Sequence, residues 1–345
     1  MNIEQLENTA KAMATPEKGI LAADESTPTC TKRFESIGVA STEQTRNAYR
    51  SMLFTTEGME EFISGVILFD ETLRQNTVDG GISFPKYLQD KGVLPGIKVD
   101  KGAKPLAGYE GEKVTEGLDG LRDRLAEYYD LGARFAKWRA VITIGKDTPS
   151  SACIEANAHA LARYAALCQE ADMVPIVEPE ILMDGEHDID VSFEVTEETL
   201  RTVFDALYRE DVYLEGMILK PNMVLSGYSC AKQASVEEVA EATVTCFLRA
   251  VPAAVPGICF LSGGQSDLLA TQHLNAMNAM DEVVKPWKLS FSYGRALQQA
   301  ALKAWGGDDS NVETAQKAIY HRAKCNGAAT VGQYSEKMEK ESTPV

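Results

Sequence analysis

Short apolar runs recur along the chain, and each ends in charged or hydroxyl residues. Each run is too short for a stable helix but has the length of a buried strand, and several follow glycine or proline. These runs predict eight strands, at residues 19–25, 65–71, 96–100, 135–139, 174–180, 216–221, 257–264 and 289–295.

Helical patterns fill most of the intervals between these runs. Ser235-Val-Glu-Glu238 has the form of a capping box, with serine as N-cap and glutamate three residues later. The helices are predicted at residues 122–131, 149–170, 196–208, 235–250 and 266–280. Strands that are apolar along their whole length indicate a parallel sheet covered by helices.

The fold class predicted from this pattern is α/β, as a closed (β/α)8 TIM barrel. An open doubly wound sheet is the second interpretation. The barrel is favoured because the strand count is eight and because polar residues stand at the C-terminal end of the runs, where a barrel gathers its catalytic groups. Residues 1–345 are predicted to form a single domain. We expect a helix at about residues 1–16 outside the barrel and a mobile polar tail at about residues 324–345.

Composition narrows the location and the partners. The formal net charge of −17 argues against nucleic acid and anionic membranes as partners. We find no apolar run of about 18 residues and no signal-like segment, so a cytoplasmic location is expected. The seven cysteines form no C-x-x-C pair, which indicates reduced thiols. The four histidines form no H-x-H or H-x-x-x-H pattern, so no metal site is predicted.

Lys220 is the most informative polar residue at these strand ends, because it follows the apolar residues Met217-Ile-Leu and precedes Pro221. A lone ammonium there is costly unless it is paired or neutral. Burial and a nearby Lys137 would lower the pKa of Lys220, and a neutral amine can attack a ketone. Position alone leaves two interpretations equally open: a covalent amine nucleophile, or a buried ion pair with Glu178 or Glu180.

Other charged residues occur in pairs two positions apart, which point to the same side of a strand. These pairs are 98/100, 137/139 and 178/180. Glu178, crowded by Glu180, is the candidate general acid and base, and Asp24 would assist a cleavage step in which a hydroxyl proton leaves. The alternative is that both glutamates only balance the lysines.

Two glycine-containing turns after the last two strands predict an anion site. Ser262-Gly263-Gly264 stands at a strand-to-helix junction, where backbone N–H groups can approach an anion. Ser292-Tyr-Gly294-Arg295 repeats this arrangement on the next strand and adds a bidentate cation. A phosphate site after strands 7 and 8 recurs in TIM barrels. Lys98, Arg139 and Arg33 could hold a second anionic group across the mouth.

These residues lie in motifs that resemble the class I (Schiff-base) fructose-1,6-bisphosphate aldolase family. The resemblance runs in one order over residues 13–307, and the combined motifs are highly specific. They occupy residues 19–27, 96–102, 135–139, 176–181, 219–224, 260–266, 291–297 and 301–307.

The resemblance implies that Lys220 forms a Schiff base with dihydroxyacetone phosphate and that Glu178 shuttles its protons. Lys137 would stabilise charge, and Asp24 would orient the amine and help to cleave C3–C4. The implied substrate-binding residues are Ser262, Gly263, Gly294 and Arg295 at the 1-phosphate, and Ser26, Arg33, Lys98 and Arg139, with Glu180, towards the other end. The family acts on a small sugar bisphosphate in glycolysis and gluconeogenesis without metal or cofactor, commonly as a homotetramer.

Two departures from the family pattern concern the far end of the substrate. Pro28-Thr29 stands where the family usually has Gly-Ser, and Pro28 removes an N–H and fixes φ. Animal members end in a tyrosine on a mobile tail, whereas this chain ends in Pro344-Val345 and Tyr334 is too distant to replace it. Three alternatives stay open: an aldolase preferring another ketose phosphate such as sedoheptulose 1,7-bisphosphate, another Schiff-base barrel enzyme such as a transaldolase, and a non-catalytic binding role.

Overall fold

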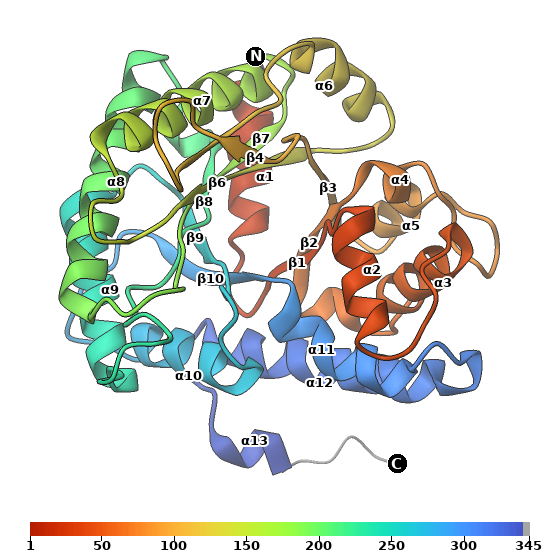
Figure 1. The fold of residues 1–345 in the computed structure, drawn as a ribbon. Helices are drawn as coiled ribbons and strands as arrows, with labels where there is room; N and C mark the ends of the chain where they lie inside the picture. Colours follow the sequence, from red (N-terminus) through yellow and green to blue (C-terminus); the bar gives the residue numbers. More distant parts are fainter. Residues whose placement is uncertain (341–345) are drawn as a thin grey trace.

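The computed structural model describes residues 1–340, and its centre is a closed ring of eight parallel strands surrounded by helices (Figure 1). The ring closes because β1 pairs with both β2 and β10. The predicted (β/α)8 barrel is therefore confirmed, and the open sheet is wrong. The strands of the ring are β1 (Gly19–Ala23), β2 (Ile63–Leu68), β3 (Leu94–Lys98), β6 (Phe135–Ile142), β7 (Val174–Ile181), β8 (Ile218–Leu219), β9 (Gly257–Phe260) and β10 (Lys288–Tyr293).

Each of these strands coincides with one of the predicted apolar runs. Several of the predicted runs are longer than the strands, because their polar residues at the C-terminal end lie beyond the last residue of the strand. Lys220 is an example: it follows β8, and its backbone N–H still donates to the Val177 carbonyl at 2.8 Å. The sequence missed a short antiparallel hairpin between β3 and β6, made of β4 (Ala103–Pro105) and β5 (Lys113–Thr115).

Helices cover the outer face of the ring. They are α2 (Thr27–Glu35), α3 (Glu43–Phe54), α4 (Asp70–Leu73), α5 (Phe84–Asp90), α6 (Leu121–Asp130), α7 (Ser151–Glu170), α8 (Ile189–Arg209), α9 (Val236–Ala250), α10 (Asp267–Asn278), α11 (Arg295–Trp305) and α12 (Val312–Ala329), with 3₁₀ turns at Met59–Glu61, Leu214–Gly216 and Asp309–Asn311. The predicted capping box at Ser235 is present at the start of α9. Helix α8 begins seven residues earlier than Thr196, where we placed it, because Asp188 caps it by accepting from the Val191 N–H at 3.0 Å. None of the helices within residues 1–340 is long and apolar enough to cross a membrane.

The N-terminal helix α1 (Ile3–Met13) closes the barrel at the N-terminal ends of the strands (Figure 1). Its buried face, Leu6, Ala10 and Met13, joins the apolar cluster that fills the barrel, together with Ile20 and Phe135. The Phe135 ring occupies this space so fully that a Cβ on Gly96 would lie 2.1 Å from it. Helix α1 thus lies outside the strand ring but seals the end opposite the polar rim.

The C-terminal segment corrects one predicted boundary. Residues 324–329, expected in a mobile tail, complete α12, and Cys325, Asn326 and Ala329 are buried because α12 packs against α10 and α11. The short helix α13 (Glu336–Lys340) follows at the edge of the molecule (Figure 1). The final five residues of the predicted tail lie outside the described residues.

Candidate active site

A cavity of about 510 Å³ opens at the C-terminal ends of the barrel strands. Every catalytic and substrate-binding residue predicted from the sequence lines it. These are Asp24, Ser26, Arg33, Lys98, Lys137, Arg139, Glu178, Glu180, Lys220, Ser262, Gly263, Gly294 and Arg295. The paired positions on β6 and β7 therefore point to the same side of their strands, into the barrel mouth, as expected.

Four charged side chains at the floor of this cavity alternate in sign. Lys137 Nζ lies 2.9 Å from Asp24 Oδ2 and 3.0 Å from Glu178 Oε2. The other oxygen of Glu178 lies 3.3 Å from Lys220 Nζ. The side chains of Lys137, Glu178 and Lys220 are at most 5 % exposed. In this order, Asp24–Lys137–Glu178–Lys220, each charge is balanced by the next.

The two lysines that share Glu178 have opposite pKa shifts. Burial lowers the pKa of Lys220, and the opposing attraction of Glu178 does not restore it. Burial alone would also lower the pKa of Lys137, but Asp24 and Glu178 together raise it well above its usual value. Lys220 is thus the lysine suited to become a neutral amine, whereas Lys137 stays an ammonium ion. Of the partners that the sequence offered for a Lys220 ion pair, Glu178 is the one in contact, and this contact leaves a role as nucleophile open.

Asp24 is held in its charged form. Burial by itself would raise the pKa of Asp24, but Lys137 and then Lys220 outweigh that effect and lower the pKa far below its ordinary value. Glu180, which we expected to crowd Glu178, instead forms an ion pair with Arg139. The charges nearest Glu178 are therefore two lysine nitrogens rather than a second carboxylate.

One end of the cavity has the features of an anion site. Gly263, after β9, has a φ of +59° that favours glycine, and a Cβ there would lie 2.4 Å from Met183. Gly294 is the N-cap of α11, so the free N–H groups of that helix begin beside the cavity. Arg295 is exposed, and no carboxylate within residues 1–340 pairs with it. The Ser292 hydroxyl lines the cavity while 1 % exposed, and among the described residues it has no hydrogen-bond partner.

The opposite side of the cavity is formed by α2 and by cations that are already paired. Arg33 pairs with Glu25, and Lys98 Nζ lies 2.8 Å from Asp100 Oδ1. Ser26 is the N-cap of α2, and its hydroxyl lies 3.1 Å from that of Thr29. Pro28 stands in the first turn, where its missing N–H would have no partner inside the helix in any case. The departure at Pro28 and Thr29 is therefore compatible with a helix start facing the cavity.

Several lining residues were not singled out from the sequence as site residues. They are Ala22, Glu25, Thr29, Lys32, Ser36 and Leu261. A signal for part of this set was present, because positions 29, 32, 33 and 36 follow the i, i+3, i+4, i+7 spacing of one helix face. That spacing adds Lys32, an exposed ammonium, to the cations on the α2 side.

A buried hydrogen-bond network behind the cavity holds the Glu25–Arg33 pair. Gln298 Nε2 donates to Glu25 Oε1 at 3.0 Å and to the Ala22 carbonyl at 2.6 Å. The Tyr49 hydroxyl donates to Gln298 Oε1 at 3.0 Å. Gln298 is 1 % exposed and Tyr49 3 % exposed, so the network is dry and its geometry is restricted.

This chain is similar to known proteins over nearly its whole length. The family model described as "Fructose-bisphosphate aldolase class-I" matches residues 5–344. A relative from Xanthomonas campestris pv. campestris, named "Probable fructose-bisphosphate aldolase class 1", is 63 % identical over 97 % of this chain and 99 % of its own length. "Fructose-bisphosphate aldolase 4, cytosolic" of Arabidopsis thaliana is 56 % identical over 94 % of this chain and 82 % of its own.

A solved structure extends the similarity to three dimensions. Fructose-bisphosphate aldolase from Plasmodium falciparum, in a ternary complex with TRAP and a small-molecule inhibitor, superimposes with a TM-score of 0.94 at 48 % identity, covering 96 % of this chain and 95 % of that one. Both the family model and these relatives span nearly the whole barrel. The chain belongs to the class I fructose-bisphosphate aldolase family.

Proposed function

We propose that this protein reversibly cleaves fructose 1,6-bisphosphate to dihydroxyacetone phosphate and glyceraldehyde 3-phosphate through a Schiff base on Lys220, with no metal or cofactor. The observation that carries the proposal is the geometry at the cavity floor: Lys137 contacts two carboxylates, Asp24 and Glu178, whereas the buried Lys220 contacts Glu178 alone. A neutral amine beside a carboxylate and a permanent ammonium is the arrangement that imine chemistry requires. The relatives named above are fructose-bisphosphate aldolases, which favours this substrate over sedoheptulose 1,7-bisphosphate, over transaldolase chemistry and over a non-catalytic role.

The reaction begins at the ketone carbon C2 of the sugar. The Lys220 amine attacks C2, and the Glu178 carboxylate takes a proton from the attacking nitrogen as the carbinolamine forms. Glu178 then returns this proton to the hydroxyl, so that water leaves and a protonated imine remains. Asp24 accepts the proton of the C4 hydroxyl as the C3–C4 bond breaks. The electron pair of that bond passes into the imine to give an enamine, and glyceraldehyde 3-phosphate leaves. The charged Lys137 stabilises the C2 oxygen earlier, while the carbinolamine forms and loses water.

The enamine is then protonated at C3, and hydrolysis of the imine releases dihydroxyacetone phosphate and restores the Lys220 amine. Gly263, Gly294 and Arg295, with Ser262, bind the 1-phosphate, since backbone N–H groups and a bidentate guanidinium suit a phosphate. Ser26, Arg33 and Lys98 bind the 6-phosphate, and Arg139 and Glu180 contact the sugar between the two ends. We further propose a cytoplasmic homo-oligomer, as is common in the family, that binds neither nucleic acid nor membrane.

Trapping the imine tests the proposed function directly. The purified protein is treated with dihydroxyacetone phosphate and borohydride, and the modified peptide is located by mass spectrometry. We expect one reduced adduct, on Lys220, and cleavage of fructose 1,6-bisphosphate that EDTA does not inhibit. An adduct on another lysine, or no cleavage activity in the unmodified protein, would contradict the proposal.

Replacing Lys137 with methionine should move the pH dependence of imine formation. Lys137 lowers the pKa of Lys220, so its removal raises that pKa. In the Lys137→Met protein, Lys220 is therefore already protonated at pH values at which the amine of the unmodified protein is still neutral. The rate of borohydride trapping against pH measures this, and the acidic limb is expected to shift to higher pH. Lys98→Met is the matched control because Lys98 lines the cavity but does not contact Lys220; an equal shift there would contradict the interpretation.

Replacing Gln298 with glutamate should weaken binding of the far phosphate. The new carboxylate would face the Glu25 carboxylate, to which the amide now donates, and would pull the Glu25–Arg33 pair out of position. KM for fructose 1,6-bisphosphate is expected to rise about tenfold, the scale of one charged hydrogen bond, with little change for fructose 1-phosphate. Gln169→Glu is the matched control: Gln169 is buried, donates to the Tyr213 and Gly216 carbonyls and lies at the opposite end of the barrel. Equal losses on both substrates would indicate a purely structural role.

A further inference from the structure

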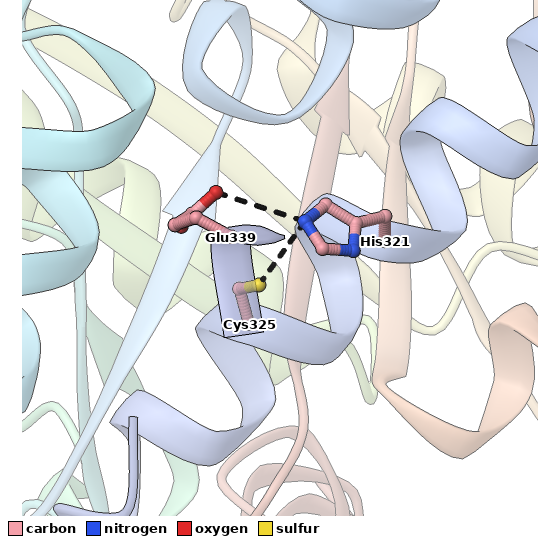
Figure 2. Close-up of side chains that lie close together, drawn as sticks. All are labelled: His321, Cys325 and Glu339. Carbon is pink, nitrogen blue, oxygen red and sulfur yellow. Dashed lines mark hydrogen bonds and ion pairs between the residues drawn. The ribbon is translucent and has the colours of Figure 1, made fainter. Parts of the chain in front are cut away.

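Three potential metal ligands converge where α13 meets α12, outside the active-site cavity (Figure 2). His321 and Cys325 are four residues apart on α12 and project from the same face, and Glu339 comes from α13. His321 Nε2 lies 3.7 Å from Cys325 Sγ and 3.6 Å from Glu339 Oε2. All three donor atoms lie within 4.8 Å of one another. Within residues 1–340, this is the single group of its kind.

The histidine–glutamate separation is long for a direct hydrogen bond, whereas the cysteine–histidine contact is a hydrogen bond to sulfur, and both distances also fit donors that share one ion. An N···O hydrogen bond is normally about 2.7–3.2 Å long, so the 3.6 Å histidine–glutamate pair is a weak contact. A tetrahedral Zn²⁺ has bonds of roughly 2.3 Å to sulfur and 2.0–2.2 Å to nitrogen and oxygen. Such bonds place sulfur and nitrogen about 3.6 Å apart, and nitrogen and oxygen about 3.4 Å apart. The two distances from His321 Nε2 are within a few tenths of an ångström of these values, and the sulfur and oxygen donors lie within 4.8 Å of each other.

Neighbouring side chains orient the carboxylate ligand. Arg322 Nη1 lies 2.6 Å from Glu339 Oε1 and 2.5 Å from Oε2, and the Tyr334 hydroxyl donates to Oε1 at 2.9 Å. The Arg322 side chain is 5 % exposed and is itself fixed by the Thr271 hydroxyl at 2.7 Å. Glu339 Oε2 accepts one hydrogen bond, from Arg322, and its second lone pair is available towards His321. Metal-binding carboxylates are commonly held in this way by groups that do not touch the metal.

The site is also reachable and chemically suited to zinc. The side chains of His321 and Glu339 are 20 % and 26 % exposed, so an ion can enter from solvent while Cys325 is buried. One imidazole, one thiolate and one carboxylate form a donor set typical of Zn²⁺ rather than of Mg²⁺ or Ca²⁺.

We propose that His321, Cys325 and Glu339 bind one Zn²⁺ ion, with water as the fourth ligand, and that the ion fastens α13 to α12. This role is separate from the chemistry at Lys220. The sequence predicted no metal site because the spacings considered there, His–His and Cys–Cys, do not include His-x-x-x-Cys, and because Glu339 is 14 residues beyond Cys325.

Metal titration of the full-length, reduced and metal-free protein tests the proposal. We expect calorimetry to give one Zn²⁺ per chain, and Co²⁺ to produce a thiolate charge-transfer absorption band that Zn²⁺ removes. Cys325→Ser should abolish the band, and His321→Ala and Glu339→Gln should weaken Zn²⁺ binding at least about tenfold. Zn²⁺ should also slow amide hydrogen exchange in α13 of the unmodified protein.

Matched controls come from the same residue types elsewhere. Cys230 is a partly exposed free thiol, and His159 is an exposed histidine 3.9 Å from Glu210, so Cys230→Ser and His159→Ala should bind Zn²⁺ normally. Circular dichroism and aldolase turnover report whether each variant is folded, since the cluster lies outside the cavity. A missing Co²⁺ band in the unmodified protein, or a band that survives in Cys325→Ser, would overturn the site. Wild-type affinity in Glu339→Gln would overturn the link to α13.

Discussion

Replacing Lys220 with alanine is expected to lower kcat for fructose 1,6-bisphosphate cleavage by roughly 10⁴-fold or more, the scale seen when a covalent nucleophile is lost. Burial acts on both lysines at the cavity floor, but only the pKa of Lys220 ends below its ordinary value. We therefore expect no neighbouring group to replace its neutral amine. Lys137 cannot do so because two carboxylates, Asp24 and Glu178, hold it as an ammonium ion. Cleavage kinetics and borohydride trapping measure the loss, and the adduct should disappear.

Measuring substrate binding by the Lys220→Ala protein distinguishes a loss of the chemical step from a damaged binding site. The anion-binding residues stand on other strands and helices, so the Lys220→Ala protein should still bind fructose 1,6-bisphosphate, with a Kd measurable by calorimetry. Lys220→Arg provides a second test, because it keeps a positive charge but cannot become a neutral amine. Residual trapping on Lys137 in either variant would show that the assignment of the two lysines is wrong.

Replacing Glu178 with glutamine should lower kcat by roughly 10²–10⁴-fold, the usual contribution of a general acid and base. Glu178 is the carboxylate in contact with Lys220, at 3.3 Å, and an amide of the same shape cannot transfer protons during carbinolamine dehydration. Lys137 keeps its contact with Asp24, so the floor of the cavity retains one ion pair. Single-turnover kinetics should show slow formation of the imine rather than weak substrate binding.

Glu180→Gln is the matched control for this prediction. Glu180 stands two residues along the same strand and lines the same cavity, but it pairs with Arg139 rather than with a lysine at the floor. We expect its main effect on KM. Equal losses of kcat in the two variants would mean that Glu178 acts through charge balance alone, the alternative that the sequence left open.

Part of this site could be predicted because the relevant information is local. The apolar runs indicated strands, their count indicated a closed ring, and a ring brings all C-terminal strand ends to one mouth. Residues as distant in sequence as Asp24 and Arg295 could therefore be assigned to one cavity. The helical spacing of Thr29, Lys32 and Ser36 was available in the same way and would have extended the set.

Other parts could not be predicted because they depend on contacts between distant elements. The Gln298 network joins residues that are 249 to 276 positions apart, from α3, α11 and the end of β1. No local pattern marks a buried glutamine as a partner of Glu25. The early start of α8 was missed for a different reason: it depends on the cap at Asp188, eight residues before Thr196, where the helical pattern was recognised.

The sequence by itself determined that a lysine stands at the end of an apolar strand, directly before Pro221, where an ammonium is costly. It could not decide between a nucleophile and an ion pair. Only the tertiary structure placed two carboxylates around Lys137 and one beside Lys220, which distinguishes the surroundings of the two lysines. The difference arises because Coulomb energies in a buried site change steeply over a few ångströms, and those distances are set by which strands are neighbours in the closed ring.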